Sequence, residues 1–232
     1  MQTLRTTADR GHAEHGWLIS DHSFSFGDYY DPRYEDFGAL RVINEDRVVA
    51  GAGFAPHAHQ GMEILTYVLD GELRHRDSTG GMGTLRPGEL QLMSAGSGIT
   101  HSEMNGSAHT PVHFLQIWIT PNERNTEPGY QQLQLDSGAL GDGFIPVAAG
   151  APGCAPLHLR QDARVLLAWP AAGRALTQPL DPARRYYLHV ARGSITANGQ
   201  AMGAGDALML QSEAALGIET RDAAELLLFD LA

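Results

Sequence analysis

The sequence has few cysteines and few positive charges, and both shortages exclude classes of protein. Cys154 is the only cysteine among 232 residues, so neither a disulfide framework nor a thiolate metal cluster can form. Asp and Glu outnumber Lys and Arg by 27 to 16, and the net charge of −11 argues against direct binding of nucleic acid or anionic membranes. Residues 1–17 lack the apolar core of a signal peptide, and no apolar run reaches transmembrane length. We therefore expect a cytoplasmic protein with no nucleic-acid or membrane partner.

Sustained helical periodicity is also scarce, because 27 glycines and 12 prolines divide the chain into short segments. The apolar segments between them are rich in β-branched or aromatic residues and are bounded by turn signals such as Asp70-Gly71 and Asn105-Gly106. They include ALRVI (39–43), ILTYVL (64–69), ELQLM (89–93), VHFLQIWI (112–119), RVLLAW (164–169), YYLHVA (186–191), ALMLQ (207–211) and ELLLF (225–229). Many short strands at this spacing predict an all-β sandwich or barrel.

A faint internal repeat indicates two domains. LTYVLDGEL, which turns at Gly71, resembles YYLHVARGSI, which turns at Gly193, and RPGELQLM around Gly88 resembles GAGDALML around Gly205. We expect an N-terminal domain over 1–135 and a C-terminal domain over 136–232, joined by the loop-rich stretch 136–156. Because two copies already lie in one chain, a monomer is expected.

Two pairs of residues with i, i+2 spacing predict a metal site: His57 with His59, and His101 with Glu103. Residues two apart on a strand point to the same face, about 6.5–7 Å apart. Two such pairs on facing strands would bring three imidazoles and a carboxylate to one point inside a barrel. By strand parity alone Glu63 could face the same point, so the residues leave the choice of carboxylate open.

The predicted second copy lacks these ligands. Carrying the repeat offset from His57 and His59 gives Pro179 and Asp181, and the offset from His101 and Glu103 gives Ile218 and Thr220. The C-terminal domain is therefore expected to keep the scaffold without a metal.

The segments GAGFAPHAHQGMEILTYVLDGEL and PGELQLMSAGSGITHSEMNG resemble the two motifs of the cupin superfamily. Seven residues separate Glu63 from Gly71, and the bend before His101 is longer than usual; both departures are similar to those of the pirin family. Residues 15–135 resemble pirins strongly, especially bacterial bicupins with quercetin dioxygenase activity, and the C-terminal half does so in outline. The resemblance implies two tandem cupin-type jelly-roll barrels. It also implies the ligands His57, His59, His101 and Glu103, and we expect Glu63 to orient a histidine as a hydrogen-bond acceptor.

Three imidazoles and one carboxylate suit one divalent transition metal, with iron(II) as first choice and zinc, copper, manganese, cobalt or nickel as alternatives. The resemblance implies a dioxygenase that opens the heterocycle of flavonols such as quercetin with O₂ and releases CO, with Glu103 as catalytic base. Its partners would be a small aromatic substrate and O₂. The alternative is a pirin-type regulator that senses metal or redox state and binds a protein partner without turnover, and a third possibility is a metal-dependent isomerase on the same scaffold.

The other candidate residues are assigned to structure. Phe24, Phe26, Tyr29 and Tyr30 could line a pocket mouth, although core packing is the favoured interpretation. The remaining histidines considered, which lack the paired spacing, are expected to be structural: His75, His109, His113, His158 and His189.

Overall fold

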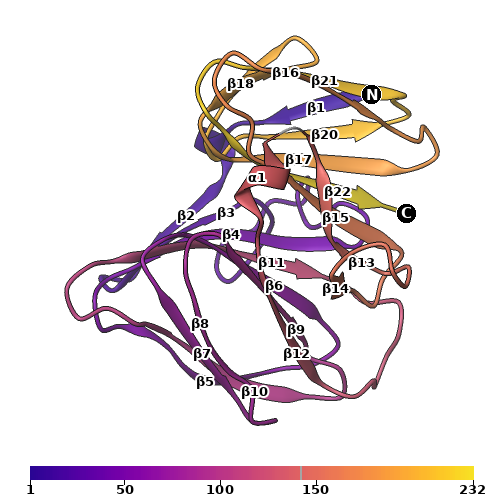
Figure 1. The fold of residues 1–232 in the computed structure, drawn as a ribbon. Helices are drawn as coiled ribbons and strands as arrows, with labels where there is room; N and C mark the ends of the chain where they lie inside the picture. The colour runs from indigo at the N-terminus through magenta and orange to yellow at the C-terminus, as the bar shows by residue number, and fades with distance from the viewer. Residues whose placement is uncertain (142) are drawn as a thin grey trace. The chain divides into compact units, whose positions relative to one another are not determined.

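The computed structural model describes residues 1–141 and 143–232, and nearly all of its regular structure is β-strand (Figure 1). Within those ranges the helices are the single turns η1 (Thr7–Asp9) and α1 (Ser137–Leu140), the latter capped by Asp136, whose side chain accepts from the N–H groups of Gly138 and Ala139. None of the helices in the described part of the chain is long and apolar enough to cross a membrane. The all-β fold expected from the sequence is confirmed.

The chain divides into two compact units. The first β unit comprises Gly11–Leu135 together with Leu159–Gln161, and the second comprises Met1–Arg10, Asp136–His158 and Asp162–Ala232. The predicted ranges 1–135 and 136–232 therefore differ from these units at two short segments. The strand Gln2–Arg5 pairs with Ala207–Leu210, which lies near the other end of the sequence. A change in composition along the chain does not reveal such a pairing between distant segments.

Two antiparallel sheets form the first β unit. They face each other, because Glu103 on one accepts hydrogen bonds from Thr66 and Gln116 on the other. The seven-stranded sheet runs β12 (Gly129–Gln134), β9 (Glu89–Ser94), β6 (Glu63–Asp70), β11 (Val112–Ile119), β4 (Leu40–Val48), β3 (Leu18–His22) and β2 (Gly11–Glu14). The four-stranded sheet runs β5 (Gly53–His59), β10 (Ile99–Asn105), β7 (Leu73–Asp77) and β8 (Met82–Leu85).

The second β unit also contains a seven-stranded and a four-stranded sheet. The larger sheet runs β1 (Gln2–Arg5), β20 (Ala207–Gln211), β17 (Arg185–Arg192), β22 (Glu225–Leu231), β15 (Ala163–Ala168), β13 (Ile145–Ala149) and β14 (Leu157–His158). The smaller sheet runs β16 (Ala175–Pro179), β21 (Ala215–Thr220), β18 (Ser194–Ala197) and β19 (Gln200–Gly203).

The strand order confirms the internal repeat. The order β9-β6-β11-β4 recurs as β20-β17-β22-β15, and β5-β10-β7-β8 recurs as β16-β21-β18-β19. The matched turn glycines both adopt the left-handed conformation that favours glycine, with φ of 80° at Gly71 and 83° at Gly193. The two glycines therefore fix which residues of the two copies correspond.

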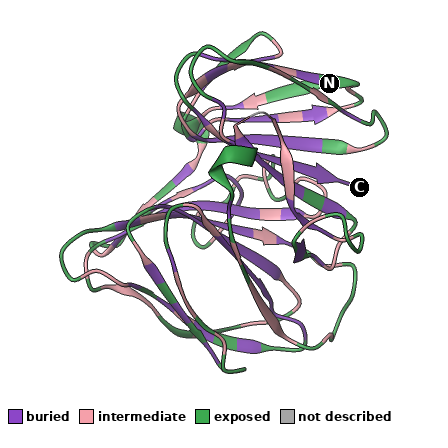
Figure 2. Cartoon of the chain, in the orientation of Figure 1, coloured by how far each residue is buried: buried purple, intermediate pink, exposed green. Residues whose placement is uncertain are grey.

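The cores of the two units differ. Sixteen buried residues from both sheets form one continuous apolar cluster in the second unit. The described core of the first unit includes two separate clusters, one around Val68 and Phe114 and one around Ile64 and Met93. Buried residues follow the strands of both units in Figure 2, whereas exposed residues gather in loops and on α1. What lies between the two clusters of the first unit is polar, and it forms the candidate site.

Candidate metal centre and its cavity

Three imidazoles converge where β5 pairs with β10. These strands are neighbours in one sheet rather than facing strands, and the register sets His57 directly opposite His101, and His59 opposite Ile99. The ring centroids lie 4.4 Å apart for His57 and His101, and 4.8 Å apart for each of the other two pairs. One nitrogen of each ring lies within 4.8 Å of the others, which is a spacing that suits ligands of a single ion. The structure thus brings the three histidines together as the i, i+2 spacing predicts.

A β-bulge in β5 carries this arrangement. The pairing passes from His101 opposite His57 to Glu103 opposite Phe54, so an additional residue of β5 enters the interval. Gly53 lies beyond the bulge, where a Cβ atom would come within 2.3 Å of the Glu103 carbonyl oxygen. A side chain at Gly53 would therefore force β5 away from β10 and separate the histidines.

The hydrogen bonds leave the Nε2 lone pairs of two of these rings available. Nδ1 of His57 lies 2.8 Å from the Ala55 carbonyl oxygen, which can only accept, so Nδ1 carries the proton. Nδ1 of His101 lies 3.4 Å from Nδ1 of His75, and Nε2 of His101 is buried without a partner among the described residues. A buried nitrogen without a partner is costly unless an unseen group satisfies it. A metal ion bound by Nε2 is such a group.

Burial keeps the imidazoles of His59 and His101 neutral. Burial, followed by the charge of neighbouring imidazoles, lowers the pKa of His59 to about 4 and that of His101 to about 3. Neutral imidazole is the form that binds a metal. These residues fit a metal site at neutral pH.

Glu103 shares a group of potential ligands with His75 and His101, separate from the group of His57, His59 and His101, and two donors hold its carboxylate. Nε2 of Gln116 donates to its Oε2 at 2.7 Å, and Oγ1 of Thr66 donates to its Oε1 at 3.3 Å. Burial raises the pKa of Glu103 to about 7 despite these hydrogen bonds, which favour the charged form. Glu103 also groups with His101 and His75, whose potential ligand atoms lie within 4.8 Å of one another.

His75 and Asp77 are functional candidates that the sequence interpretation missed. Nε2 of His75 lies 2.9 Å from Oδ2 of Asp77, and the ring reaches Nδ1 of His101 on its other side. Asp77 is itself anchored, because its Oδ1 accepts from Thr79 and from the N–H of Gly81. Burial opposes ionisation of Asp77, but these hydrogen bonds and the one from His75 lower its pKa below the usual value. The expectation that His75 is merely structural overlooked that His75-x-Asp77 has the same i, i+2 spacing as the two predicted pairs.

A row of polar residues crosses the seven-stranded sheet, which faces the sheet that carries the histidines. Successive strands set His22 opposite Asn44, Asn44 opposite Gln116, Gln116 opposite Thr66, and Thr66 opposite Gln91. All five side chains are buried. The row separates the two apolar clusters of the first unit, and its signal in the sequence is a polar residue at an inward position of each otherwise apolar strand.

Leucines occupy the same row in the second unit. Thr66 precedes Gly71 by as many residues as Leu188 precedes Gly193, so Thr66 corresponds to Leu188. Leu188 lies opposite Leu208 and Leu228 on its two neighbouring strands, and Leu228 lies opposite Leu166. These leucines belong to the continuous apolar core. The fold therefore does not require polar residues in this row, and their presence in the first unit points to function.

The register also changes the predicted equivalents of the metal ligands. From the same glycines, Leu216 and Ile218 occupy the positions of His101 and Glu103, and Gln178 lies opposite Leu216 as His57 lies opposite His101. The constant offsets that gave Pro179, Asp181, Ile218 and Thr220 were wrong because the connecting hairpins differ in length. Among the described residues, the clusters of potential metal ligands lie in the first unit.

Glu63 does not share the inward face. β5 ends at His59 and β6 begins at Glu63, and Gly61 turns between them with φ of 60°, so parity does not carry from one strand to the other. Side chains point to alternate faces along β6. Ile64 and Thr66 face the interior, so Glu63 points to the opposite face. Its carboxylate accepts from Ser94 at 2.9 Å and from the N–H of Arg160 at 3.3 Å. Ser94 and Arg160 are therefore hydrogen-bond partners of Glu63, and the expectation that Glu63 orients a histidine stays a prediction.

The site opens into a cavity of about 530 Å³, a volume typical of small-molecule sites. His57, His59 and Glu103 form part of its lining. Its apolar and aromatic walls include Leu18, Phe26, Tyr29, Phe54 and Trp118. Trp118 meets His59 edge-on at 4.9 Å and Phe26 at 5.4 Å between centroids.

The predicted aromatic cluster divides between cavity, core and surface. Phe26 and Tyr29 line the cavity, whereas Phe24 is buried in the core and Tyr30 is exposed and hydrogen-bonded to Glu35. Gly11 leaves room for the Tyr29 ring in the cavity wall, because a Cβ at Gly11 would lie 2.2 Å from that ring.

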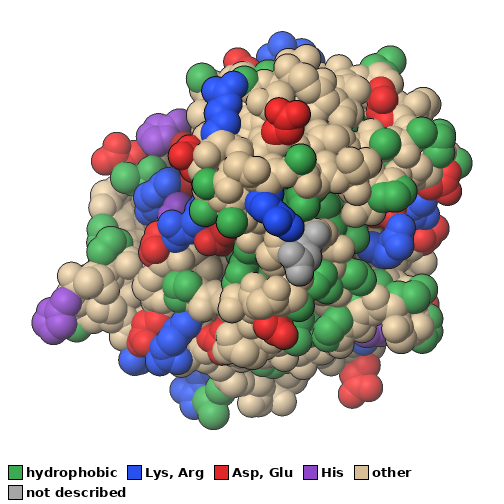
Figure 3. All heavy atoms as spheres, turned by 45° about the horizontal axis from the view of Figure 1, so that its top comes forward, with side chains coloured by type: hydrophobic (Ala, Val, Ile, Leu, Met, Phe, Trp, Pro, Cys, Tyr) green, Lys and Arg blue, Asp and Glu red, His purple; other side chains and the backbone are tan. Residues whose placement is uncertain are grey.

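The face of the molecule drawn in Figure 3 shows basic side chains dispersed among acidic ones, without a continuous basic patch.

Comparisons with known proteins agree with this architecture. Residues 3–119 match the Pirin family, and residues 147–231 match the quercetinase C-terminal cupin domain. The chain is 41% identical over 228 residues to quercetin 2,3-dioxygenase of Escherichia coli, covering 98% of this chain and 97% of the relative. It is 41% identical over 223 residues to a pirin-like protein of Caulobacter vibrioides, covering 96% of each.

A solved structure is similar over the whole chain. The bacterial pirin YhhW of Escherichia coli, in complex with nickel(II), superposes with a TM-score of 0.93 at 40% identity and covers 100% of this chain and 99% of its own. The expected tandem cupin architecture is confirmed.

Proposed function

The chain belongs to the pirin family of the cupin superfamily, and from that premise we propose that it is a metal-dependent dioxygenase of flavonols such as quercetin. The observation that carries the proposal is the buried Nε2 of His101, which has no partner in the described part of the chain. His101 belongs to one group of potential ligands with His57 and His59 and to another with His75 and Glu103, at an aromatic-walled cavity. The large majority of buried polar side-chain atoms in proteins have a hydrogen-bond partner, so an exception calls for an explanation. Named relatives with the same activity support the assignment.

We assign the metal to His57, His59, His101 and Glu103, and iron(II) to the site. Neutral imidazoles and a carboxylate suit several divalent transition metals, and affinity alone does not select among them. The closeness of this donor set to the two-histidine-one-carboxylate sites of iron oxygenases favours iron(II). The nickel(II) complex of the related structure makes nickel the first comparison metal.

The residues around the cavity perform the proton chemistry. When bound, the metal supplies positive charge that stabilises a flavonolate anion. Glu103 accepts the proton of the flavonol 3-hydroxyl at a carboxylate oxygen. Gln116 and Thr66 hold that carboxylate by donating to its two oxygens. Phe26, Tyr29 and Trp118 exclude water from the reacting ring system.

The overall reaction balances. Both atoms of O₂ enter the product depside, the two ring bonds to the carbon bearing the 3-hydroxyl break, and that carbon leaves as CO with its own oxygen. The flavonol is oxidised and O₂ is reduced, so no further oxidant or reductant is needed.

Incubation with quercetin in air tests the proposal. Protein loaded anaerobically with iron(II) should bleach the flavonol absorption band and release CO, with one O₂ consumed per flavonol. Parallel samples loaded with nickel, manganese, cobalt, copper and zinc identify the active metal. Absence of turnover with every one of these metals would contradict the dioxygenase assignment and favour the metal-sensing regulator.

Asp77→Asn tests the chain of hydrogen bonds behind His101. An amide cannot both accept from His75 and satisfy the three donors that converge on Asp77 Oδ1, so His75 loses its fixed orientation. Partners that orient metal ligands typically contribute 10–100-fold to metal affinity, and we expect about a 10-fold loss or more here. Competition with a chelator under argon measures it.

The matched control is Asp36→Asn, which makes the same chemical change on an exposed loop of the same unit. Equal metal affinities for Asp77→Asn and Asp36→Asn would show that His75 and Asp77 do not orient His101.

A further inference from the structure

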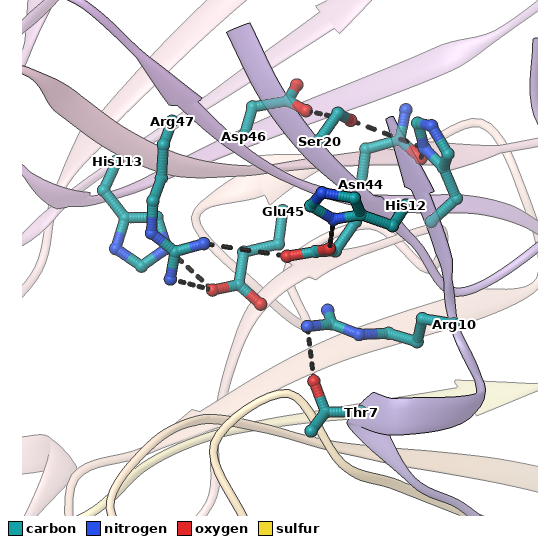
Figure 4. A network of polar contacts seen from close by, with 11 residues as sticks. Thr7, Arg10, His12, Ser20, Asn44, Glu45, Asp46, Arg47 and His113 are labelled. Atoms are coloured by element: carbon teal, nitrogen blue, oxygen red, sulfur yellow. Dashed lines mark hydrogen bonds and ion pairs between the residues drawn. The ribbon is translucent and has the colours of Figure 1, made fainter. Parts of the chain in front are cut away.

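Four polar side chains lie at the part of the cavity formed by β3 and β4. Ser20, His22, Asn44 and Asp46 all line the cavity, and each is no more than 5% exposed. The register pairs Ser20 with Asp46 and His22 with Asn44. The Ser20 hydroxyl donates to Asp46, as Figure 4 shows. Nδ1 of His22 lies 2.8 Å from Oδ1 of Asn44.

Two hydrogen-bonding atoms of this group are left over. Ser20 occupies one oxygen of Asp46, and the other, Oδ2, has no partner among the described residues. His22 occupies the Asn44 carbonyl oxygen, and the Asn44 amide nitrogen Nδ2 has no partner in the described part of the chain. Both residues are more than nine-tenths buried and border the cavity. A ligand in the cavity would therefore meet an acceptor on Asp46 and a donor on Asn44.

The fold does not demand these groups. In the second unit the position of Asn44 is Leu166, and the position of Asp46 is Ala168, opposite Leu226 as Asp46 is opposite Phe114. Leu166 and Ala168 pack into the continuous core there. Burying Asn44 and Asp46 where the second unit has Leu and Ala costs free energy unless their polar atoms are hydrogen-bonded. Asp46 Oδ2 and Asn44 Nδ2 border the cavity, where a ligand could supply those hydrogen bonds.

We propose that Asp46 and Asn44 form a second anchoring point for the substrate, which selects flavonols that carry a hydroxyl group on a ring remote from the 3-hydroxyl. The proposal rests on the dioxygenase function above. Asp46 Oδ2 accepts the hydrogen bond of the remote hydroxyl, and Asn44 Nδ2 donates to that oxygen or to a neighbouring one. Two neighbouring positions on one face of β4 lie about 6.5–7 Å apart, so adjacent oxygens of one ligand reach both side chains.

The electrostatics of the cavity are consistent with an uncharged polar ligand. Burial, with further contributions from the charges of Glu103, Asp21 and Glu45, raises the pKa of Asp46 to about 7, although the Ser20 hydrogen bond opposes the shift. A second anion at this position would be repelled by Asp46 and Glu103. A phenolic hydroxyl satisfies the carboxyl group without adding charge.

A ligand series that differs in remote hydroxyls tests the proposal by equilibrium binding. The probes are quercetin, galangin, which lacks both hydroxyls of the pendant ring, and 3-hydroxyflavone, which carries only the 3-hydroxyl. Affinities are measured under argon, where no turnover occurs, on iron(II)-loaded wild type, Asp46→Ala and Asp46→Asn. Asp46→Ala installs the residue of the second unit, and Asp46→Asn keeps an acceptor oxygen.

Wild type should bind quercetin about 10-fold or more tightly than 3-hydroxyflavone, a ratio expected for a hydrogen bond to a charged group. Galangin identifies which ring carries the selected hydroxyl. Asp46→Ala should reduce the ratio to about 2 while leaving the affinity for 3-hydroxyflavone unchanged. Asp46→Asn keeps a neutral acceptor, whose hydrogen bond is weaker than that of a carboxylate, so its ratio should lie between those of Asp46→Ala and wild type. Glu45→Gln is the matched control, because Glu45 lies on the opposite face of β4 with Arg47 and His113 (Figure 4) and should keep the wild-type ratio.

Equal affinity of wild type for quercetin and 3-hydroxyflavone overturns the anchoring point, as does an unchanged ratio in Asp46→Ala. The wild-type comparison stands even if Asp46→Ala fails to fold. Binding of no flavonol by metal-loaded wild type is a different result, since it refutes the proposed function itself and the anchoring point with it.

Discussion

His101→Ala is expected to abolish metal binding and all flavonol turnover. His101 lies on β10, the strand shared between β5 and β7, so it belongs both to the group with His57 and His59 and to the group with His75 and Glu103. Its Nε2 is a buried nitrogen without a partner among the described residues. Loss of the ring removes a proposed ligand and disconnects the Asp77–His75 pair from the site. The effect should exceed the 10–100-fold loss typical of residues that only orient a ligand.

Metal-dependent stability provides a measurement that does not rely on activity. A ligand present at 100 times its dissociation constant stabilises the folded state by about 2.7 kcal/mol. Wild type should therefore unfold at a higher temperature when iron(II) is added under argon, whereas His101→Ala should show no increase. His109→Ala is the control, because His109 lies in an exposed loop outside the cavity lining and should retain the increase.

A metal-induced increase in unfolding temperature that is the same in His101→Ala and wild type would contradict the assigned ligand set. Metal content by elemental analysis distinguishes this outcome from nonspecific binding at other histidines.

The i, i+2 spacing was sufficient to predict which side chains of β5 and of β10 point to the same face. On a strand it fixes which side chains share a face, and this local geometry holds for His57 with His59 and for His101 with Glu103. The same reasoning applies to His75 and Asp77 in the segment RHRD (74–77), because this histidine and carboxylate have the same i, i+2 spacing as His101 and Glu103. What the spacing cannot supply is the register between strands, which sets His57 opposite His101 and Glu103 opposite His75.

The errors arose where a local rule was carried across a turn. Parity from His59 to Glu63 fails because residues 60–62 leave the strand conformation and β6 joins a different sheet from β5. The polar row was missed for a related reason: its residues stand far apart in the sequence, and each is one polar residue in an apolar run. Only the pairing of neighbouring strands brings them into line. The comparison with leucines in the second unit then shows that the row is not a requirement of the fold.

Glu103→Gln is expected to lower metal affinity about 100-fold at pH 8 and flavonol turnover by a similar factor or more, because it removes both a proposed ligand charge and the proposed base. Glu63→Gln should change metal affinity less than about 3-fold, since Glu63 bonds to Ser94 and to the N–H of Arg160, and a glutamine oxygen can accept from both. The two variants make the same chemical change at two buried glutamates. A larger loss of affinity in Glu63→Gln than in Glu103→Gln would reverse the assignment of the fourth ligand.

The pH dependence of metal affinity distinguishes the effect of the negative charge of Glu103 from the effect of its size and shape. The carboxylate binds the metal and the carboxylic acid does not, so a pKa of about 7 means that protons compete with the metal below about pH 7. Glu103 should therefore make affinity fall about tenfold for each pH unit below that point, whereas His59 and His101, with pKa values of about 4 and about 3, compete only near and below pH 4. Glu103→Gln should lose this contribution between pH 7 and pH 4, visible as a shallower slope than that of wild type in chelator competition.

The metal-free protein should show the opposite sign. Between the ordinary glutamate pKa of 4.5 and about 7, the folded state holds the Glu103 proton more tightly than the unfolded state, so this group makes stability fall as pH rises. Metal affinity rises over the same interval. Both trends should become shallower in Glu103→Gln and stay as in wild type in Glu63→Gln, and the part of the stability trend that remains in Glu103→Gln is assigned to Asp46, whose pKa burial also raises to about 7. Parallel slopes for wild type and Glu103→Gln would mean that another group supplies the competing proton, and Glu103 could then not be both ligand and base.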